Sequence, residues 1–426
     1  MVASNVRLIS QPICILIKAQ FRFQGPGESN MNVPDMKGVV LANPEPVAGR
    51  RISLPARQPT HPSFSLLAIL RSNIGRDLTK LKLPVVLNEP LSTLQNQCEE
   101  LEYSHLLDAA SEMEEQTKRM LYVTTFAISA YARTASRTAT MPFTPLLGET
   151  FECVRPERQW RFLGEQVSCP SVAPCGQAAT KPICVSHNPP VTASHCESKL
   201  WSLYQEFNMK SKFWGKSLEI VPVGCCQLYF PRWQETYTWN KVTTSITNVF
   251  SPTTLSIDHT GDLTIKCSNG ASSTVHFNQH DSKRPDVRRY VCGTVNPPKG
   301  SSEDPRLLYG HWDKILVSRD ENGENRCIWR ANPLPPNSAH YYGFTKFAIE
   351  LNEPPVADAV SSGRLPITDS RLRPDQRFLE LGRIEEAEIE KTRLEDEQRH
   401  RLKMHKTTEN SRDRSSSSIW KPHWFT

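Results

Sequence analysis

Three charged side chains near the C-terminus have the spacing of one helical face. Lys391, Glu395 and Arg399 follow one another at intervals of four residues in a highly charged segment. On a helix, side chains four residues apart are neighbours, so these three can form a ladder of ion pairs. The two cations can also meet a phosphorylated ligand, because phosphate is bound by several cationic donors. Taken alone, the pattern favours a solvated salt-bridge ladder.

Two further polar clusters lie upstream. The segment PFTPLLGETFE, residues 142–152, holds Glu149 in an otherwise apolar loop, where a carboxylate needs a partner or a backbone amide. EQVS at 165–168 and VSHNPP at 185–190 share a Val-Ser pair and join across the gap as a continuous EQVSHNPP. The 18 residues between EQVS and His187, 169–186, are rich in Pro, Gly, Ala and Ser, which indicates an inserted loop.

Other chemistries find little support in the sequence. It contains no GxSxG, HExxH, P-loop or GxGxxG motif, so we predict no enzyme activity. Cys184, His187, His195 and Cys196 are zinc-type ligands, but their spacing matches no common structural site, and we expect neither a metal nor a cofactor. The net charge of +6 is spread along the chain, which argues against a dedicated nucleic-acid binder.

The elements that position these side chains are predicted by hydrophobic periodicity. A period near 3.6 predicts helices at 64–77, 90–111 and 118–134, and a charged helix after Asp369. Beyond Met141 the period shortens to two and predicts strands at 218–224, 236–247, 254–267, 273–277 and 288–295, with a hairpin turn at 258–262. Consecutive strands without helices between them imply an antiparallel sheet. A sheet of this size is best stabilised by closing into a barrel, whose interior can hold a ligand.

We therefore predict a mainly β protein with flanking helices. Residues 1–57 are expected to form a disordered or weakly ordered arm. One domain follows at 58–426, with helices at 58–140, a large near-complete antiparallel barrel at 141–355 and a C-terminal region at 356–426. No apolar run reaches the roughly 20 residues that span a bilayer, and no signal peptide is evident, so we predict a cytosolic protein.

Taken in order, several segments resemble the ligand-binding domain of the oxysterol-binding protein related family. They include LNEPLSTLQ, PFTPLLGETFE, the interrupted EQVS and SHNPP, SKFWGKSLEI, TWNKVTT and YYGFTKFAIELNE. The wording of CEELEYSHLLDAASE is most similar to the mammalian branch numbered three, six and seven. This resemblance implies a barrel around a hydrophobic lipid tunnel, closed by an N-terminal lid within about 63–83, with Leu66, Leu67 and Ile69 facing the lipid.

The resemblance also implies a function and a site. Family members exchange a sterol or glycerophospholipid for phosphatidylinositol 4-phosphate between membranes at contact sites. This implies peripheral association with the endoplasmic reticulum, plasma membrane or Golgi. The residues that match the family's headgroup site are Thr144, Glu149, His187, Asn188, Lys391, Glu395 and Arg399.

The sequence departs from the family pattern at the site itself. Met141 stands where relatives usually have a lysine, Asn188 replaces the second histidine of the signature, and 169–186 is extra. These departures leave three hypotheses open. The chain exchanges lipids; it binds a sterol or another apolar ligand as a sensor that has lost phosphoinositide exchange; or it is a scaffold that binds partners through its charged helix.

Overall fold

The computed structural model describes residues 49–59, 83–137, 140–167, 191–214, 217–248, 255–278, 288–319 and 323–410. All of them belong to one compact unit, residues 38–426; the other unit, Met1–Lys37, lies outside the described residues. The predicted helix at 64–77, the lid and the insertion at 169–186 also lie outside them.

Fourteen of the described strands form one sheet in which every pair is antiparallel. They are β3 (Thr150–Arg155), β4 (Trp160–Val167), β5 (Val191–Ser198), β6 (Ser202–Phe213), β7 (Ser217–Val223), β8 (Cys226–Phe230), β9 (Glu235–Trp239), β10 (Thr243–Thr247), β11 (Ser256–Cys267), β12 (Ser272–Phe277), β13 (Tyr290–Asn296), β14 (Arg306–His311), β15 (Ile315–Arg319) and β16 (Asn325–Arg330).

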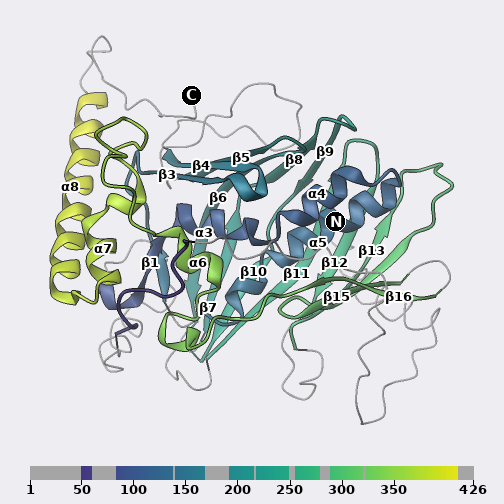
Figure 1. Ribbon diagram of the computed structural model, residues 1–426, viewed down its shortest axis with the longest axis horizontal. Helices are drawn as coiled ribbons and strands as arrows, with labels where there is room; N and C mark the ends of the chain where they lie inside the picture. The colour runs from purple at the N-terminus through teal and green to yellow at the C-terminus, as the bar shows by residue number, and fades with distance from the viewer. Residues whose placement is uncertain are drawn as a thin grey trace, which may run out of the picture. The chain divides into compact units, whose positions relative to one another are not determined.

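The sheet runs in the order β16-β15-β14-β13-β12-β11-β10-β7-β6-β5-β4-β3. Two strand pairs connect β6 to β11. The pair β7 and β10 joins one part of each long strand, and the pair β8 and β9 joins another part. The prediction of a barrel-like antiparallel sheet is confirmed. Figure 1 shows the strands around the helices that they enclose.

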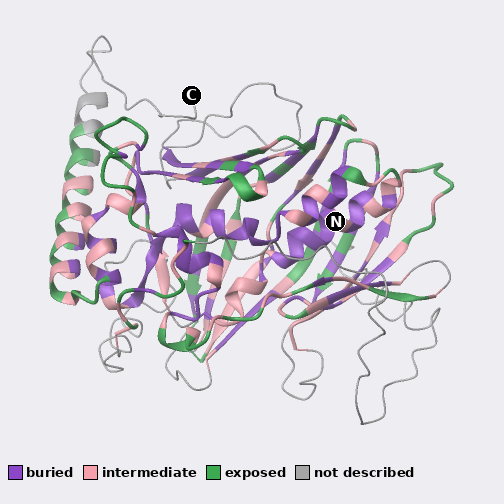
Figure 2. Ribbon diagram, in the orientation of Figure 1, coloured by how far each residue is buried: buried purple, intermediate pink, exposed green. Residues whose placement is uncertain are grey.

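Helices α3 (Thr93–Glu99), α4 (His105–Glu112) and α5 (Gln116–Ser129) precede the fourteen strands of this sheet in the sequence. Helix α5 packs on β12, β13, β14 and β16, while α3 packs on β3, β4 and β5. Buried residues therefore dominate these helices, as the purple ribbon of Figure 2 shows.

The single helix predicted at 90–111 is wrong, because this segment holds four elements. Strand β1 (Asn88–Ser92) pairs in parallel with β2 (Met141–Phe143), and α3 starts only after Ser92. Ser92 and Gln95 form a capping box, which fixes this start. A 3₁₀ turn, η3 (Glu100–Tyr103), then separates α3 from α4. The apolar spacing continues through the break, so periodicity alone did not reveal it.

The hairpin turn predicted at 258–262 is also wrong. These residues lie inside the continuous strand β11. Asp258 pairs with Ser245 of β10 on one side of β11, and Asp262 pairs with His276 of β12 on its other side, so the strand continues through these residues without a turn. Gly261, inside the strand, has a φ of +114°, which lies in the region that favours glycine.

The predicted weakly ordered arm does not extend to residue 57. Arg51 lies 2.7 Å from Glu380 and Arg50 lies 2.7 Å from Glu353, and the side chain of Leu54 is buried. Residues 49–59 are therefore part of the folded domain. Short-range composition did not indicate this, since the partners are about 300 residues away.

The C-terminal region carries α6 (Lys346–Leu351), α7 (Pro374–Glu380) and α8 (Ile384–Asn410). The chain turns between α7 and α8 at Gly382, whose φ is +76°. Helix α8 packs on α7 and on η2 (Val85–Leu87), and Ala387 is buried there. None of the described helices is both long and apolar enough to cross a membrane.

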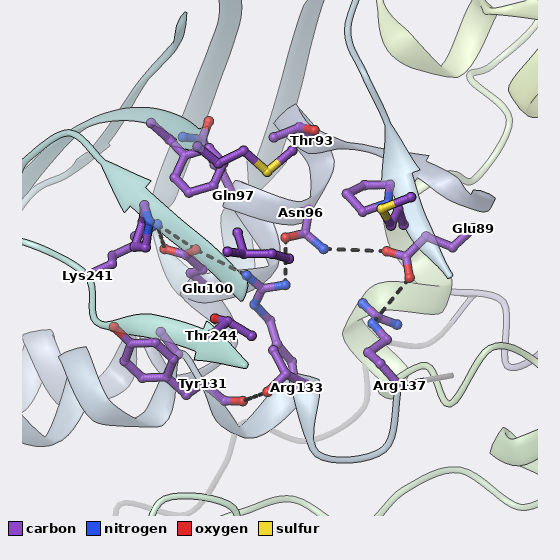
Figure 3. Close-up of a pocket in the computed structure, with 18 of the residues that line it drawn as sticks. Glu89, Thr93, Asn96, Gln97, Glu100, Tyr131, Arg133, Arg137, Lys241 and Thr244 are labelled. Atoms are coloured by element: carbon purple, nitrogen blue, oxygen red, sulfur yellow. Dashed lines mark hydrogen bonds and ion pairs between the residues drawn. The ribbon is translucent and has the colours of Figure 1, made fainter. Parts of the chain in front are cut away.

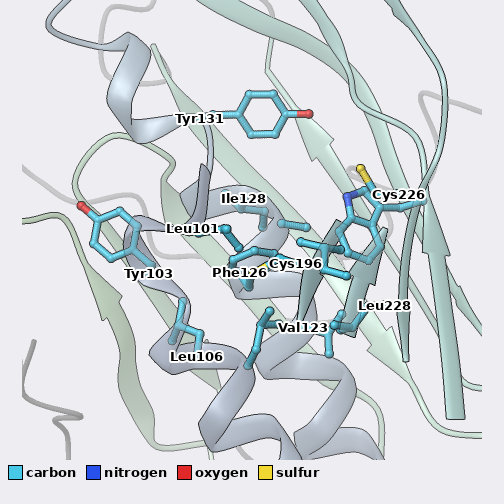
Figure 4. Close-up of a cluster of buried hydrophobic side chains, with 14 of the residues drawn as sticks. Leu101, Tyr103, Leu106, Val123, Phe126, Ile128, Tyr131, Cys196, Cys226 and Leu228 are labelled. Atoms are coloured by element: carbon cyan, nitrogen blue, oxygen red, sulfur yellow. The ribbon is translucent and has the colours of Figure 1, made fainter. Parts of the chain in front are cut away.

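A large buried cluster joins the helices to the sheet. In Figure 4, Val123 of α5 lies near Leu228 of β8, and Phe126 and Ile128 of α5 belong to the same cluster. A buried ion pair ties the same helix to β9: Arg119 donates to both carboxylate oxygens of Glu235, at 2.7 and 3.0 Å. Tyr237 also donates to Glu235, at 2.7 Å. These contacts hold α5 in position against the wall of the barrel.

We expect Glu235→Gln to destabilise the fold by about 3–5 kcal/mol, because the change leaves the Arg119 charge buried without its partner. The free energy of unfolding in urea measures this loss. The double variant Arg119→Met with Glu235→Leu removes both charges and is expected to be the more stable of the two variants. A single variant with wild-type stability would contradict this role.

Candidate functional site

A cavity of about 270 Å³ lies inside the barrel. Its inner wall is formed by α3, α5, β6, β7, β10 and β11, and its other end reaches α8 through Lys391 and Glu395. The cavity therefore connects the interior of the barrel with the surface beside the C-terminal helix.

Apolar side chains form much of the wall. Alternation along β7 directs Leu218, Ile220 and Pro222 into the cavity. Phe207 and Met209 of β6 also line it, and Met209 pairs with Pro222. The alternation that predicted β7 therefore also determines which of its side chains face the cavity. Such a wall favours an apolar guest, at about 25 cal/mol per Å² removed from water.

A polar network forms another part of the lining (Figure 3). Lys241 donates to both oxygens of Glu100, at 2.7 and 2.8 Å. Arg133 donates to Glu100 at 3.2 Å and to Asn96 at 2.7 Å. Arg133 also lies 3.7 Å from Glu99, so the two cations meet two carboxylates, and this network can position the wall without a charged ligand.

Glu89 and Arg137 continue the network toward β1. Their side chains lie 3.6 Å apart, and Asn96 donates to Glu89 at 3.4 Å. Burial raises the pKa of Glu89, and the nearby Arg137 guanidinium opposes this rise. Arg137 is itself paired with Glu99. The network thus links α3 and β1 to the segment after α5.

Two amide side chains in the lining have unpaired atoms. Gln97 is 2% exposed, and within the described part of the chain neither its Nε2 nor its Oε1 has a hydrogen-bond partner. The same holds for the Oδ1 atom of Asn88. An unpaired buried polar group costs about 1–3 kcal/mol. A ligand with a polar group near Gln97 would offset that cost.

These network residues were not among the site residues predicted from the sequence. Asn96, Gln97 and Glu100 follow the motif LNEPLSTLQ, and Lys241 lies in TWNKVTT. These two motifs, which match the family, could therefore have indicated the network residues. Nothing in the local sequence indicated that the two motifs meet, because that depends on the closure of the barrel.

The structure separates the three residues predicted to share the face of α8. Lys391 is 8% exposed, lines the cavity, donates to the Leu83 carbonyl oxygen and lies 3.3 Å from Glu395. Glu395 also lines the cavity. Arg399 is not among the lining residues: its side chain is 46% exposed and paired with Asp396. Lys391 is therefore the cation of this set that already meets the cavity.

Glu149 is 4% exposed and does not line the cavity. It accepts from Arg373 at 2.8 Å, from Ser370 at 2.5 Å and from the Leu146 amide at 2.9 Å. Burial raises the pKa of Glu149, while Arg373 opposes that shift. The prediction that this carboxylate needs a partner is confirmed.

Arg373 brings Glu149 into indirect contact with the cavity. It lines the cavity and donates to the Thr144 carbonyl oxygen at 2.9 Å and to Asp375 at 2.6 Å. Burial disfavours its charged form, but Glu149 and Asp375 raise the pKa of Arg373. Thr144 and Met141 lie in the same part of the lining. Glu149 thus positions Arg373.

The remaining predicted site residues lie outside the described residues. They are His187 and Asn188 of the interrupted signature and Leu66, Leu67 and Ile69 of the lid. Their roles stay predictions. Within the described part of the chain, no three His, Cys, Asp or Glu side chains are grouped so that they could hold a metal ion.

Comparisons with known proteins agree with this architecture. The family model described as oxysterol-binding protein matches residues 65–180 and 184–426. Oxysterol-binding protein-related protein 3 of Mus musculus is 43% identical over 367 residues, 86% of this chain and 40% of that protein. Oxysterol-binding protein-related protein 7 of Homo sapiens is 44% identical over 360 residues, 83% of this chain and 39% of that protein. The chain thus spans about two-fifths of these relatives' length.

Two solved structures share the fold. The Osh3 ORD of Saccharomyces cerevisiae, solved in complex with PI(4)P, has a TM-score of 0.71 at 33% identity, covering 84% of this chain and 88% of that chain. The Osh1 ORD, in complex with cholesterol, has a TM-score of 0.73 at 32% identity, covering 88% and 86%. With its barrel, its cavity and these matches over most of its length, this chain belongs to the oxysterol-binding protein family.

Proposed function

We propose that this chain binds one lipid in its cavity and transfers it between membranes. The observation that carries this proposal is a cavity with apolar walls that ends beside the buried Lys391. Apolar walls take the body of a lipid out of water, and a cation at the end can meet a phosphorylated headgroup. The complexes of the two similar ORD structures, with PI(4)P and with cholesterol, support the same assignment.

The specific reaction in this proposal is an exchange. A sterol or glycerophospholipid is carried in one direction, and phosphatidylinositol 4-phosphate in the other. Lys391 meets the phosphate, Glu395 meets inositol hydroxyls, and Arg373 is held at the same end by Glu149. Arg399 joins the headgroup only after it releases Asp396.

A second candidate is a lipid sensor that has lost phosphoinositide exchange. Met141 lines the cavity near Thr144 and brings no charge there. Arg373, at the same end, is already neutralised by Glu149 and Asp375. Few positive charges therefore remain for a phosphate, which favours an uncharged ligand.

Extraction from liposomes separates these two candidates. The purified chain is offered labelled phosphatidylinositol 4-phosphate, a sterol and phosphatidylserine in parallel. The exchange proposal expects uptake of the phosphoinositide and of a second lipid. Sterol uptake alone would favour the sensor, above all if Met141→Lys with Asn188→His and deletion of 169–186 restored phosphoinositide uptake.

We expect Lys391→Ala to lower phosphoinositide extraction about 10- to 100-fold, because a charge-assisted hydrogen bond contributes about 1.5–3 kcal/mol. Sterol uptake should stay unchanged. Arg399→Ala should cost less, since its side chain lies outside the cavity lining. Arg393→Ala is the matched control, an exposed arginine on α8 that is paired with Glu390 and Glu397. Equal losses in all three variants would contradict this assignment.

Gln97→Leu tests the polar end of the ligand. The change removes a buried amide without partners, so the free protein should be as stable as the wild type or more stable by about 1 kcal/mol. The affinity for a lipid with a hydroxyl should fall about tenfold, because that group loses its partner. Urea unfolding and binding of a fluorescent sterol measure the two effects, with the exposed Gln227→Leu as control. Unchanged affinity would show that Gln97 does not meet the ligand.

A further inference from the structure

The hairpin of β6 and β7 ends in an exposed tryptophan that the cavity does not use. Trp214 follows β6, and its amide donates to the Ser217 carbonyl oxygen at 2.8 Å, which closes the hairpin. The residue is 59% exposed, although tryptophan is usually well buried. Its indole N–H donates to Glu219 at 3.4 Å. An exposed indole at the end of β6, with its N–H on Glu219, suits a contact surface.

The outward side of the same hairpin combines apolar and basic residues. Lys212 pairs with Glu219, and Lys210 pairs with Val221. Because side chains alternate along a strand, these residues lie on the same side of the sheet. Lys210, Lys212, Val221 and Val223 are all exposed. The Lys212 ammonium lies 5.9 Å from the centre of the Trp214 ring. We call Trp214, Lys210, Lys212, Val221 and Val223 the β6–β7 face.

We propose that the β6–β7 face docks on an anionic lipid bilayer. Tryptophan suits this partner because its ring is apolar and its N–H is polar, so it settles at the level of the headgroups. The lysines add attraction to anionic lipids, and their long stems can lie along an apolar surface. Glu219 offsets one of the two positive charges. We therefore expect the indole to contribute more to the free energy of membrane binding than the lysines do.

The position of this face suits lipid transfer. The inward side chains of the same strands, among them Met209, Leu218 and Ile220, line the cavity. A bilayer docked on the outer side is therefore separated from the cavity by the thickness of one sheet. Figure 1 shows β7 beside β10 in this wall. The inference rests on the proposed function, because transfer requires contact with a membrane.

Flotation with vesicles tests the docking surface. The full chain is mixed with vesicles of phosphatidylcholine alone or with an equal share of phosphatidylserine. Trp214→Ala should weaken binding to the anionic vesicles at least about tenfold. Each of Lys210→Gln and Lys212→Gln should weaken it up to about fivefold, and added salt should act in the same direction. The matched controls, Tyr229→Ala on β8 and Lys266→Gln on β11, replace exposed residues elsewhere on the sheet and should bind as the wild type does.

Uptake of a fluorescent sterol from cyclodextrin, without any bilayer, reports on the cavity separately. Weaker flotation of Trp214→Ala with normal sterol uptake supports the proposal. Wild-type flotation of Trp214→Ala overturns it, and so does a wild-type chain that binds no vesicles, in which case the face fits a protein partner better. Failure of sterol uptake in the wild type, with flotation that depends on Trp214, would contradict the proposed function and leave the docking surface intact.

Discussion

Charges buried inside an otherwise apolar wall are the constraint on which the cavity depends. Lys241, Arg133 and Glu100 belong to three different segments and meet where solvent screens little. Removing one partner of such a set leaves an uncompensated charge, which costs far more than a surface ion pair provides. The helices must therefore stay at a fixed position against the sheet. The cavity between the helices and the sheet therefore depends both on these ion pairs and on the apolar packing.

Helix α8 shows how one charged segment can serve two purposes. Arg393 pairs with Glu390 and Glu397 on the exposed side, as in an ordinary solvated ladder. Lys391, two residues earlier, is buried at the end of the cavity. The two interpretations of this segment, surface ladder and ligand site, thus apply to different faces. The packing of α8 on α7 and η2 decides which face meets the cavity.

The sequence predicted strands close to β7, β11, β12 and β13, because alternation is imposed locally, by the burial of one face of each strand. The single strand predicted at 236–247 is wrong, because residues 240–242 separate β9 from β10. The sequence also failed at 258–262, which lie inside a continuous strand, and at 90–111, where helical spacing continues through a break. For the site, the need of Glu149 for a partner was predictable, but Arg373 as that partner was not. The two are 224 residues apart, and only the folded chain brings them together. The exposed tip at Trp214 depends in the same way on how the hairpin packs.

Photocrosslinking with a diazirine sterol, mapped on peptides, tests the central claim that the cavity holds the lipid. The account predicts adducts on the inward residues of β6 and β7, such as Met209 and Ile220, and on α5 near Phe126. An excess of unlabelled sterol should suppress these adducts. Adducts confined to outward residues of the sheet, or none that unlabelled sterol removes, would contradict a lipid-binding cavity in this chain.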